Sequence, residues 1–355
     1  FPALFFSLTL SAQNVQSQAL SPEEQVNGIM KTMTIDDKIG QMLLIDYSTI
    51  RNNFNDIVNY KIGNIHFGAD SDPFLNTSGA WVTICDSMQT IAIASNLKIP
   101  LLLSTDAIHG HSNVSNATIF PQNIGLGCTR NARLVEEEGK ITAFETAATG
   151  IRLVFCPEIA VTNDIRWGGS YLSYGENVSL VSQMGNAFIN GFNSTVLPDN
   201  GKVLGCPKFS GSVKFNKDAS EIRYCATSDN SVSVTLDSSL KKSNAILLSS
   251  TLFSRKQSSQ NNLDYIQKFK NNFKGIIITD WELTNTLQDD YYNILKTAIN
   301  AGVDLFMEPS SYKLFIENIK KANTAGEIPT SRIDDAVKRI LTQKIKMGLF
   351  RHPLS

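Results

Sequence analysis

The sequence lacks several features that would have defined its class directly. No apolar run approaches the ~18 residues that a membrane-spanning helix needs. The formal net charge is −1, so neither nucleic acid nor an anionic membrane surface is indicated as a partner. The five cysteines form no CxxC pair and there are four histidines, so no zinc ligand set is evident, and we predict neither a metal nor a cofactor. What remains is the composition of a globular protein of 355 residues.

The first residues resemble the end of a secretory signal peptide. Residues 1–20 contain an apolar stretch followed by small residues, with a cleavage site expected near Ser11 and Ala12. The alternative is an N-terminal arm that packs on the body of the protein. Five Asn-X-Ser/Thr sequences support secretion and predict N-linked glycans: Asn76, Asn113, Asn116, Asn177 and Asn193.

These features predict a secreted or extracellular protein, or one of the endolysosomal lumen. In an oxidising compartment Cys206 and Cys225 are the pair we expect to form a disulfide. Five buried thiols are the alternative.

Short apolar runs alternate with helical patterns along nearly the whole chain. The runs predict strands at 42–46, 62–67, 100–105, 152–155, 203–206, 245–249, 276–279 and 303–307. This alternation predicts a single domain over 21–350, folded as a (β/α)8 TIM-type barrel of the α/β class. A doubly wound open sheet would place a Gly-rich phosphate loop after the first strand, and 42–53 has none. Region 207–250 shows little helical periodicity, so we expect a distorted βα unit or a long loop there.

The strand predicted at 276–279 ends in Asp280 and Trp281. A carboxylate at the end of a buried strand costs several kcal/mol unless it is hydrogen-bonded or stands in a polar cleft. In a parallel barrel the carboxyl ends of the strands form the active-site face, so the position predicts a catalytic role for Asp280. The alternative is a cap on the following helix.

Polar residues also follow three other predicted strands. Asp106 comes after the third strand with His109 and His111 close behind, Arg166 follows the fourth and Lys208 the fifth. Together with the Asp-Trp pair after the seventh strand, they would form a pocket suited to a sugar. Charged groups bind hydroxyls strongly, and indole faces cover the apolar side of a pyranose. Each residue alone has a structural explanation, but their recurrence at strand ends favours a site.

Five segments together resemble the N-terminal barrel domain of family 3 glycoside hydrolases, in the β-glucosidase and β-glucan exohydrolase branch. They are residues 100–111, 117–127, 164–168, 277–281 and 331–350, and they occur in the family's order. The resemblance implies retaining exo-hydrolysis of a β-linked glucoside or oligosaccharide, with Asp280 as the nucleophile. It also implies that Asp106, Arg166 and Lys208 bind the sugar hydroxyls and that Trp281 lines the mouth of the pocket.

The chain departs from the family pattern at several positions. Family members usually carry Lys-His-Phe after the fifth strand, whereas no His follows Lys208 here. An Arg and a Glu of the family pattern are replaced by Gly169 and Leu172. In two-domain relatives the second carboxyl of the retaining mechanism comes from a following domain. Asp218 and Glu221 are acids in the chain's own 207–250 region that could replace it.

Two functions are consistent with this pattern. The first is a β-glycosidase whose hydrolysis is weak or absent in this chain alone, because no general acid is evident. The second is a non-catalytic glycoprotein that binds carbohydrate, or that assembles with copies of itself or with a partner protein. The retained acids Asp106 and Asp280 favour the first function, and the lost family residues favour the second.

Overall fold

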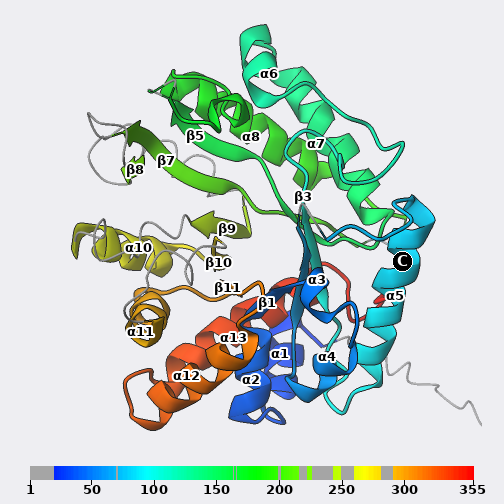
Figure 1. Ribbon diagram of the computed structural model, residues 1–355, viewed down its shortest axis with the longest axis vertical. Coiled ribbons are helices and arrows are strands. Elements are labelled where there is room, and N and C mark those ends of the chain that lie inside the picture. Colours follow the sequence, from blue (N-terminus) through cyan, green and yellow to red (C-terminus); the bar gives the residue numbers. More distant parts are fainter. Residues whose placement is uncertain are drawn as a thin grey trace, which may run out of the picture.

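The computed structural model describes residues 20–68, 71–162, 164, 166–198, 201–215, 222–225, 243–248, 260–280 and 291–355. Within these ranges each of the eight predicted strands is present (Figure 1). They are β1 (Leu43–Asp46), β2 (Asn64–Phe67), β3 (Leu102–Asp106), β4 (Leu153–Phe155), β6 (Leu204–Gly205), β9 (Ala245–Leu248), β10 (Ile276–Thr279) and β11 (Phe306–Met307).

Parallel pairing carries the sheet around a barrel. One sheet has the order β11-β1-β2-β3-β4-β6. Beyond the cis peptide bond Cys156–Pro157, β4 continues as β5 (Glu158–Thr162), and β6 continues as β7 (Lys208–Phe215). These continuations belong to the second sheet, β10-β9-β7-β5. The amide N–H groups of Asp304 and Leu305 donate to Ile277 O and join β10 to β11. The predicted (β/α)8 barrel is therefore confirmed.

The unit after β6 is distorted, as the sequence predicts. Strand β7 pairs antiparallel with β8 (Ile222–Cys225), so this part of the 207–250 region forms a hairpin on the barrel. In Figure 1 the hairpin projects from the barrel away from α5.

Helices cover the outside of the barrel (Figure 1). The first, α1, starts with a capping box in which the side chain of Ser21 accepts from the amide of Glu24 and the Glu24 carboxylate accepts from Ser21. The helices are α1 (Pro22–Met30), α2 (Ile35–Gln41), α3 (Tyr47–Ile50), α4 (Asn55–Asn59), α5 (Ser78–Ala94), α6 (Asn123–Thr129), α7 (Ala132–Ala147), η1 (Ser170–Leu172), α8 (Val178–Ser194), α10 (Gln260–Asn272), α11 (Tyr291–Ala301), α12 (Tyr312–Thr324) and α13 (Thr330–Lys346). No helix among the described residues is long and apolar enough to cross a membrane.

A buried lysine binds backbone and side-chain acceptors at the amino ends of three barrel strands. The Lys344 side chain is fully buried, and its Nζ donates to Gln41 Oε1 (2.8 Å), Gly63 O (2.8 Å) and Pro100 O (2.9 Å). These acceptors immediately precede or lie close to the starts of β1, β2 and β3. One residue of α13 therefore satisfies buried acceptors at three neighbouring strands.

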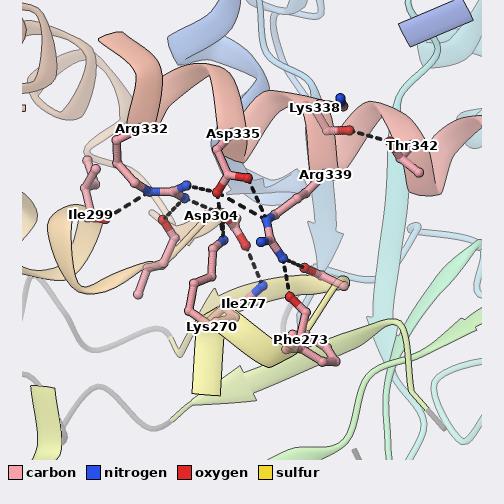
Figure 2. Close-up of polar contacts among 12 residues, drawn as sticks. Lys270, Phe273, Ile277, Ile299, Asp304, Arg332, Asp335, Lys338, Arg339 and Thr342 are labelled. Carbon is pink, nitrogen blue, oxygen red and sulfur yellow. Dashed lines mark hydrogen bonds and ion pairs between the residues drawn. The ribbon is translucent and has the colours of Figure 1, made fainter. Parts of the chain in front are cut away.

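A charged network fastens α10 and α13 to the last two strands (Figure 2). The fully buried Asp304 carboxylate accepts from Lys270 Nζ and Arg332 Nη2 through Oδ1, and from Ile277 N (3.0 Å) through Oδ2. Asp335 of α13 lies 3.3 Å from Lys270 Nζ and bonds Arg332. The network links α10, β10 and α13 to the residue that leads into β11.

The expected disulfide between Cys206 and Cys225 is wrong. Cys206 is a free thiol with no exposed surface, at the junction of β6 and β7. Burial raises the pKa of this thiol well above its ordinary value, which keeps it protonated and unreactive. Cys85 and Cys156 are likewise buried free thiols, and Cys128 is an exposed one.

Candidate functional site

Three of the predicted site residues lie at the carboxyl ends of barrel strands. Asp106 is the last residue of β3, and Asp280 directly follows β10. Lys208 lies just beyond the end of β6, where it begins the continuation of that strand, β7. All strands of the barrel run in the same direction, so these ends meet at one mouth. The fold thus gathers residues that are 174 positions apart in sequence, from 106 to 280.

Asp106 and Lys208 form the centre of the site. Lys208 Nζ lies 2.5 Å from Asp106 Oδ1, and the two side chains are 18% and 31% exposed. On the other side, His66 Nε2 lies 3.4 Å from Asp106 Oδ2. His66 is itself oriented by a 3.0 Å contact from Nδ1 to Ser104 Oγ on the neighbouring strand. The carboxylate is therefore held between a cation and an imidazole.

These contacts shift the titration of both partners. Burial alone would raise the pKa of Asp106, but the positive charge of Lys208 and the hydrogen bond from His66 hold it well below its usual range. Burial alone would lower the pKa of Lys208, but the charges of Asp106, Asp280 and Glu158 hold it above its usual value. Lys208 and Asp106 are thus both charged near neutral pH, and charged groups form strong hydrogen bonds with hydroxyls.

Asp280 lies at the same mouth and is partly exposed. Its backbone N–H donates to Leu248 O of β9 at 3.1 Å, which fixes the main chain where β10 ends. Because its charge raises the pKa of Lys208, the carboxylate lies within electrostatic range of the Asp106–Lys208 pair. Asp280 therefore lies at the active-site face, where the strand pattern predicts a catalytic residue.

Arg166 lies in the segment after β5, and its contact with the sugar stays a prediction. Its guanidinium pairs with Asp164, with Nε 2.9 Å from Oδ1 and Nη2 2.5 Å from Oδ2, and its side chain is 43% exposed. The hydrogen bonds that the guanidinium donates to the Asp164 carboxylate raise the pKa of Arg166. Trp281, Asp218 and Glu221 lie outside the described residues.

The two histidines after β3 have structural environments. His109 Nδ1 lies 3.2 Å from Phe120 O, and the buried His111 places Nε2 2.8 Å from Thr149 Oγ1. Burial lowers the pKa of His111 to about 4, so it is neutral near pH 7. Within the described part of the chain no three His, Cys, Asp or Glu side chains are arranged to hold a metal ion.

The five glycosylation sequences have two kinds of environment. Asn76 donates from Nδ2 to Asn113 O at 2.5 Å, and Asn113 donates from Nδ2 to Thr105 Oγ1 at 2.8 Å. These two nitrogens, which a glycan would have to occupy, are used inside the fold. The remaining three side chains are exposed: Asn116, Asn177 and Asn193.

A separate hollow of about 750 Å³ opens at the opposite end of the barrel. Its lining includes Thr34, Ile57 and Ala92, from the segments around α2, α4 and α5. None of the predicted site residues lines it. The mouth that holds Asp106 is therefore the better candidate for chemistry.

Two residues of the mouth are absent from the predicted site. Phe67 contacts Trp81 of α5 outside the barrel, so the alternation along β2 turns His66 inward. The signal for His66 was a polar residue inside a buried strand. Glu158 is 4% exposed, and the sequence signal for it was a single acid in the apolar run 153–161.

The chain has relatives among known proteins. The sequence model described as "Glycosyl hydrolase family 3 N terminal domain" matches residues 34–216 and 235–343. The chain is 27% identical to the lysosomal beta glucosidase of Dictyostelium discoideum over 92% of its own length, and 27% identical to the periplasmic beta-glucosidase of Salmonella typhimurium over 95%. It covers 44% of each of these relatives, so it spans less than half of their length.

The fold has close counterparts among solved structures. The exo-1,3/1,4-beta-glucanase ExoP from a Pseudoalteromonas species, as its Q683A mutant, superposes with a TM-score of 0.77 at 30% identity. The match covers 93% of this chain and 55% of that one.

Proposed function

Because the chain belongs to glycosyl hydrolase family 3, we propose that it carries the sugar site of a retaining β-glycosidase, with Asp280 as the nucleophile. The observation that carries the proposal is the position of Asp280 at the end of β10, within electrostatic range of the Asp106–Lys208 pair. We take a β-linked glucoside as the substrate class, in line with the names of the relatives.

The chemistry divides between two sets of groups. The Asp280 carboxylate attacks the anomeric carbon and forms a covalent glycosyl ester, which water later hydrolyses. Asp106 accepts hydrogen bonds from the sugar hydroxyls, and Lys208 donates to them. Both are charged, so they hold the ring in place for attack. In this proposal Arg166 and Trp281 contribute at the rim.

Turnover by this chain alone is expected to be slow. The retaining mechanism needs a second carboxyl about 5–5.5 Å from the nucleophile to protonate the leaving oxygen. The proposal assigns that role to no described residue. Loss of acid assistance typically slows the reaction ~10²–10⁴-fold. Substrates with good leaving groups need little of that assistance and should be the ones turned over.

A second candidate function is carbohydrate binding without turnover. What favours it is the replacement of the family's Arg and Glu by Gly169 and Leu172, whose side chains cannot donate a proton to a leaving group. Secretion and N-glycosylation belong to both candidates. They rest on the acceptor sequences, of which three are exposed.

Labelling with a 2-deoxy-2-fluoro-β-glucosyl fluoride tests the nucleophile. The fluoride leaves without proton donation, and the 2-fluoro group slows hydrolysis of the glycosyl ester, so the adduct accumulates. Intact mass should rise by one fluoroglucosyl group, and peptide mapping should place it on Asp280. Asp280→Asn should take no label while keeping the circular dichroism spectrum of the wild type.

The outcomes separate the two candidate functions. Absence of label in folded wild type that still binds glucose would favour binding without turnover. A label on a carboxylate other than Asp280 would contradict the assignment of the nucleophile.

A further inference from the structure

Glu158 is a buried acid beside the sugar-binding lysine that the proposed chemistry leaves without a role. It is the first residue of β5 and is 4% exposed. It is in register with Lys208 of β7, and Lys208 N donates to the preceding carbonyl, Pro157 O, at 2.9 Å. Residues in register on neighbouring parallel strands project to the same face of the sheet, so the two side chains share one face.

The strand order explains why Lys208 needs support. In the barrel, the strand formed by β4 and β5 lies between β3 and the strand formed by β6 and β7. Lys208 on β7 nevertheless reaches Asp106 on β3, two strands away and roughly 9–10 Å across the sheet. Its side chain must therefore cross the intervening strand, which is the strand that carries Glu158.

Charge supports the same arrangement. Glu158 is one of three carboxylates whose charges raise the pKa of Lys208, with Asp106 and Asp280. The Lys208 ammonium pairs with Asp106 at 2.5 Å. Glu158 lies beside the lysine on β5, in the strand that the lysine side chain crosses. A lysine stem is flexible, with about 2 kcal/mol of rotamer entropy, so a single partner at its tip leaves the path of the stem weakly defined.

We propose that Glu158 is a positioning residue for Lys208, holding the ammonium over the mouth of the barrel so that it can bind a sugar hydroxyl while paired with Asp106. The role rests on the proposed function of the site. Glu158 acts through Lys208, and the proposal gives it no contact with the substrate. Neutralising it leaves Lys208 with a less defined position and weakens the site for glucose.

The test combines two readouts on Glu158→Gln. The first is the ¹⁵Nζ–¹H signal of Lys208 in protein labelled with ¹⁵N-lysine, assigned by its loss in Lys208→Arg. We expect the signal to shift in Glu158→Gln, and its titration midpoint to fall. The second is calorimetric binding of glucose, which should weaken about tenfold. Glu158→Asp retains the charge on a shorter stem and should give a smaller change in both.

Glu138→Gln is the matched control. Glu138 is a buried acid on α7 whose charge acts on Cys156 and Tyr174. Burial raises the pKa of Glu138 to about 8, so the variants are compared at pH 9, where this carboxyl is charged. This variant should leave the Lys208 signal and glucose binding unchanged.

Each outcome decides the proposal. An unmoved Lys208 signal in Glu158→Gln would overturn it, as would a moved signal with wild-type glucose affinity. Equal effects in the control would also overturn it, because they would indicate a general response to losing a buried acid. If the wild type binds no glucose, the proposed function fails, while the Lys208 signal still shows whether Glu158 holds the lysine.

Discussion

Asp304→Asn tests whether the charged network in Figure 2 holds the last strands of the barrel to their helices. The substitution keeps the size of the side chain and one oxygen that can accept from Ile277 N. It removes the negative charge shared by Lys270 and Arg332, whose side chains are 9% and 13% exposed. The change therefore isolates the electrostatic part of the interaction.

The size of the effect follows from burial. Removing one partner of a buried ion pair typically costs about 3–5 kcal/mol, because an uncompensated charge remains in the interior. Asp335 still lies 3.3 Å from Lys270 Nζ and supplies part of the lost charge. Burial lowers the pKa of Lys270 to about 8 even though Asp304 opposes this, so without Asp304 the ammonium loses its proton more readily. Both effects place the expected loss at the lower end, about 3 kcal/mol.

Chemical denaturation of wild type and variant measures this loss directly. Asp36→Asn is the control, because Asp36 pairs with Lys320 at 2.9 Å with both side chains nearly half exposed, and such pairs are worth about 0–1 kcal/mol. A thermal scan should show a drop of roughly 6 °C for Asp304→Asn, at about 2 °C per kcal/mol. If the two variants lose the same stability, the argument from burial is refuted.

Two further predictions concern the buried lysine and the glycans. Burial lowers the pKa of Lys344 to about 7. Between about pH 7 and 10 the unfolded chain therefore binds one more proton than the folded chain. This difference adds a component to the free energy of unfolding that increases with pH. This component should be absent from Lys344→Met, and denaturation curves of both proteins over that window check it; parallel pH profiles would contradict it. In protein expressed through a secretory pathway we expect glycans at the exposed acceptors Asn116, Asn177 and Asn193, and none at Asn76 or Asn113. Mass mapping after endoglycosidase treatment identifies the occupied sites. A glycan at Asn76 or Asn113 would contradict the reasoning.

Much of the site could be predicted because it follows directly from the strand pattern. A polar residue that ends an apolar run in an alternating β/α chain must lie at the mouth of the barrel, whichever strands are neighbours. That rule was sufficient for Asp106, Lys208 and Asp280. For Arg166 the sugar contact stays a prediction, and the structure shows its guanidinium paired with Asp164, two residues away in the same loop.

The sequence by itself determined the eight strands, their order and the acids and lysine at their ends, because hydrophobic periodicity is a local property of the chain. Only the tertiary structure decided which of these residues meet. The continuations of β4 and β6 as β5 and β7 carry the chain from one sheet to the other, and closure of the barrel brings His66 and Glu158 into the same mouth as Lys208. It likewise left Cys206 a free, buried thiol near the Cys156 thiol. Such contacts depend on distances between strands far apart in sequence, and no local pattern encodes them.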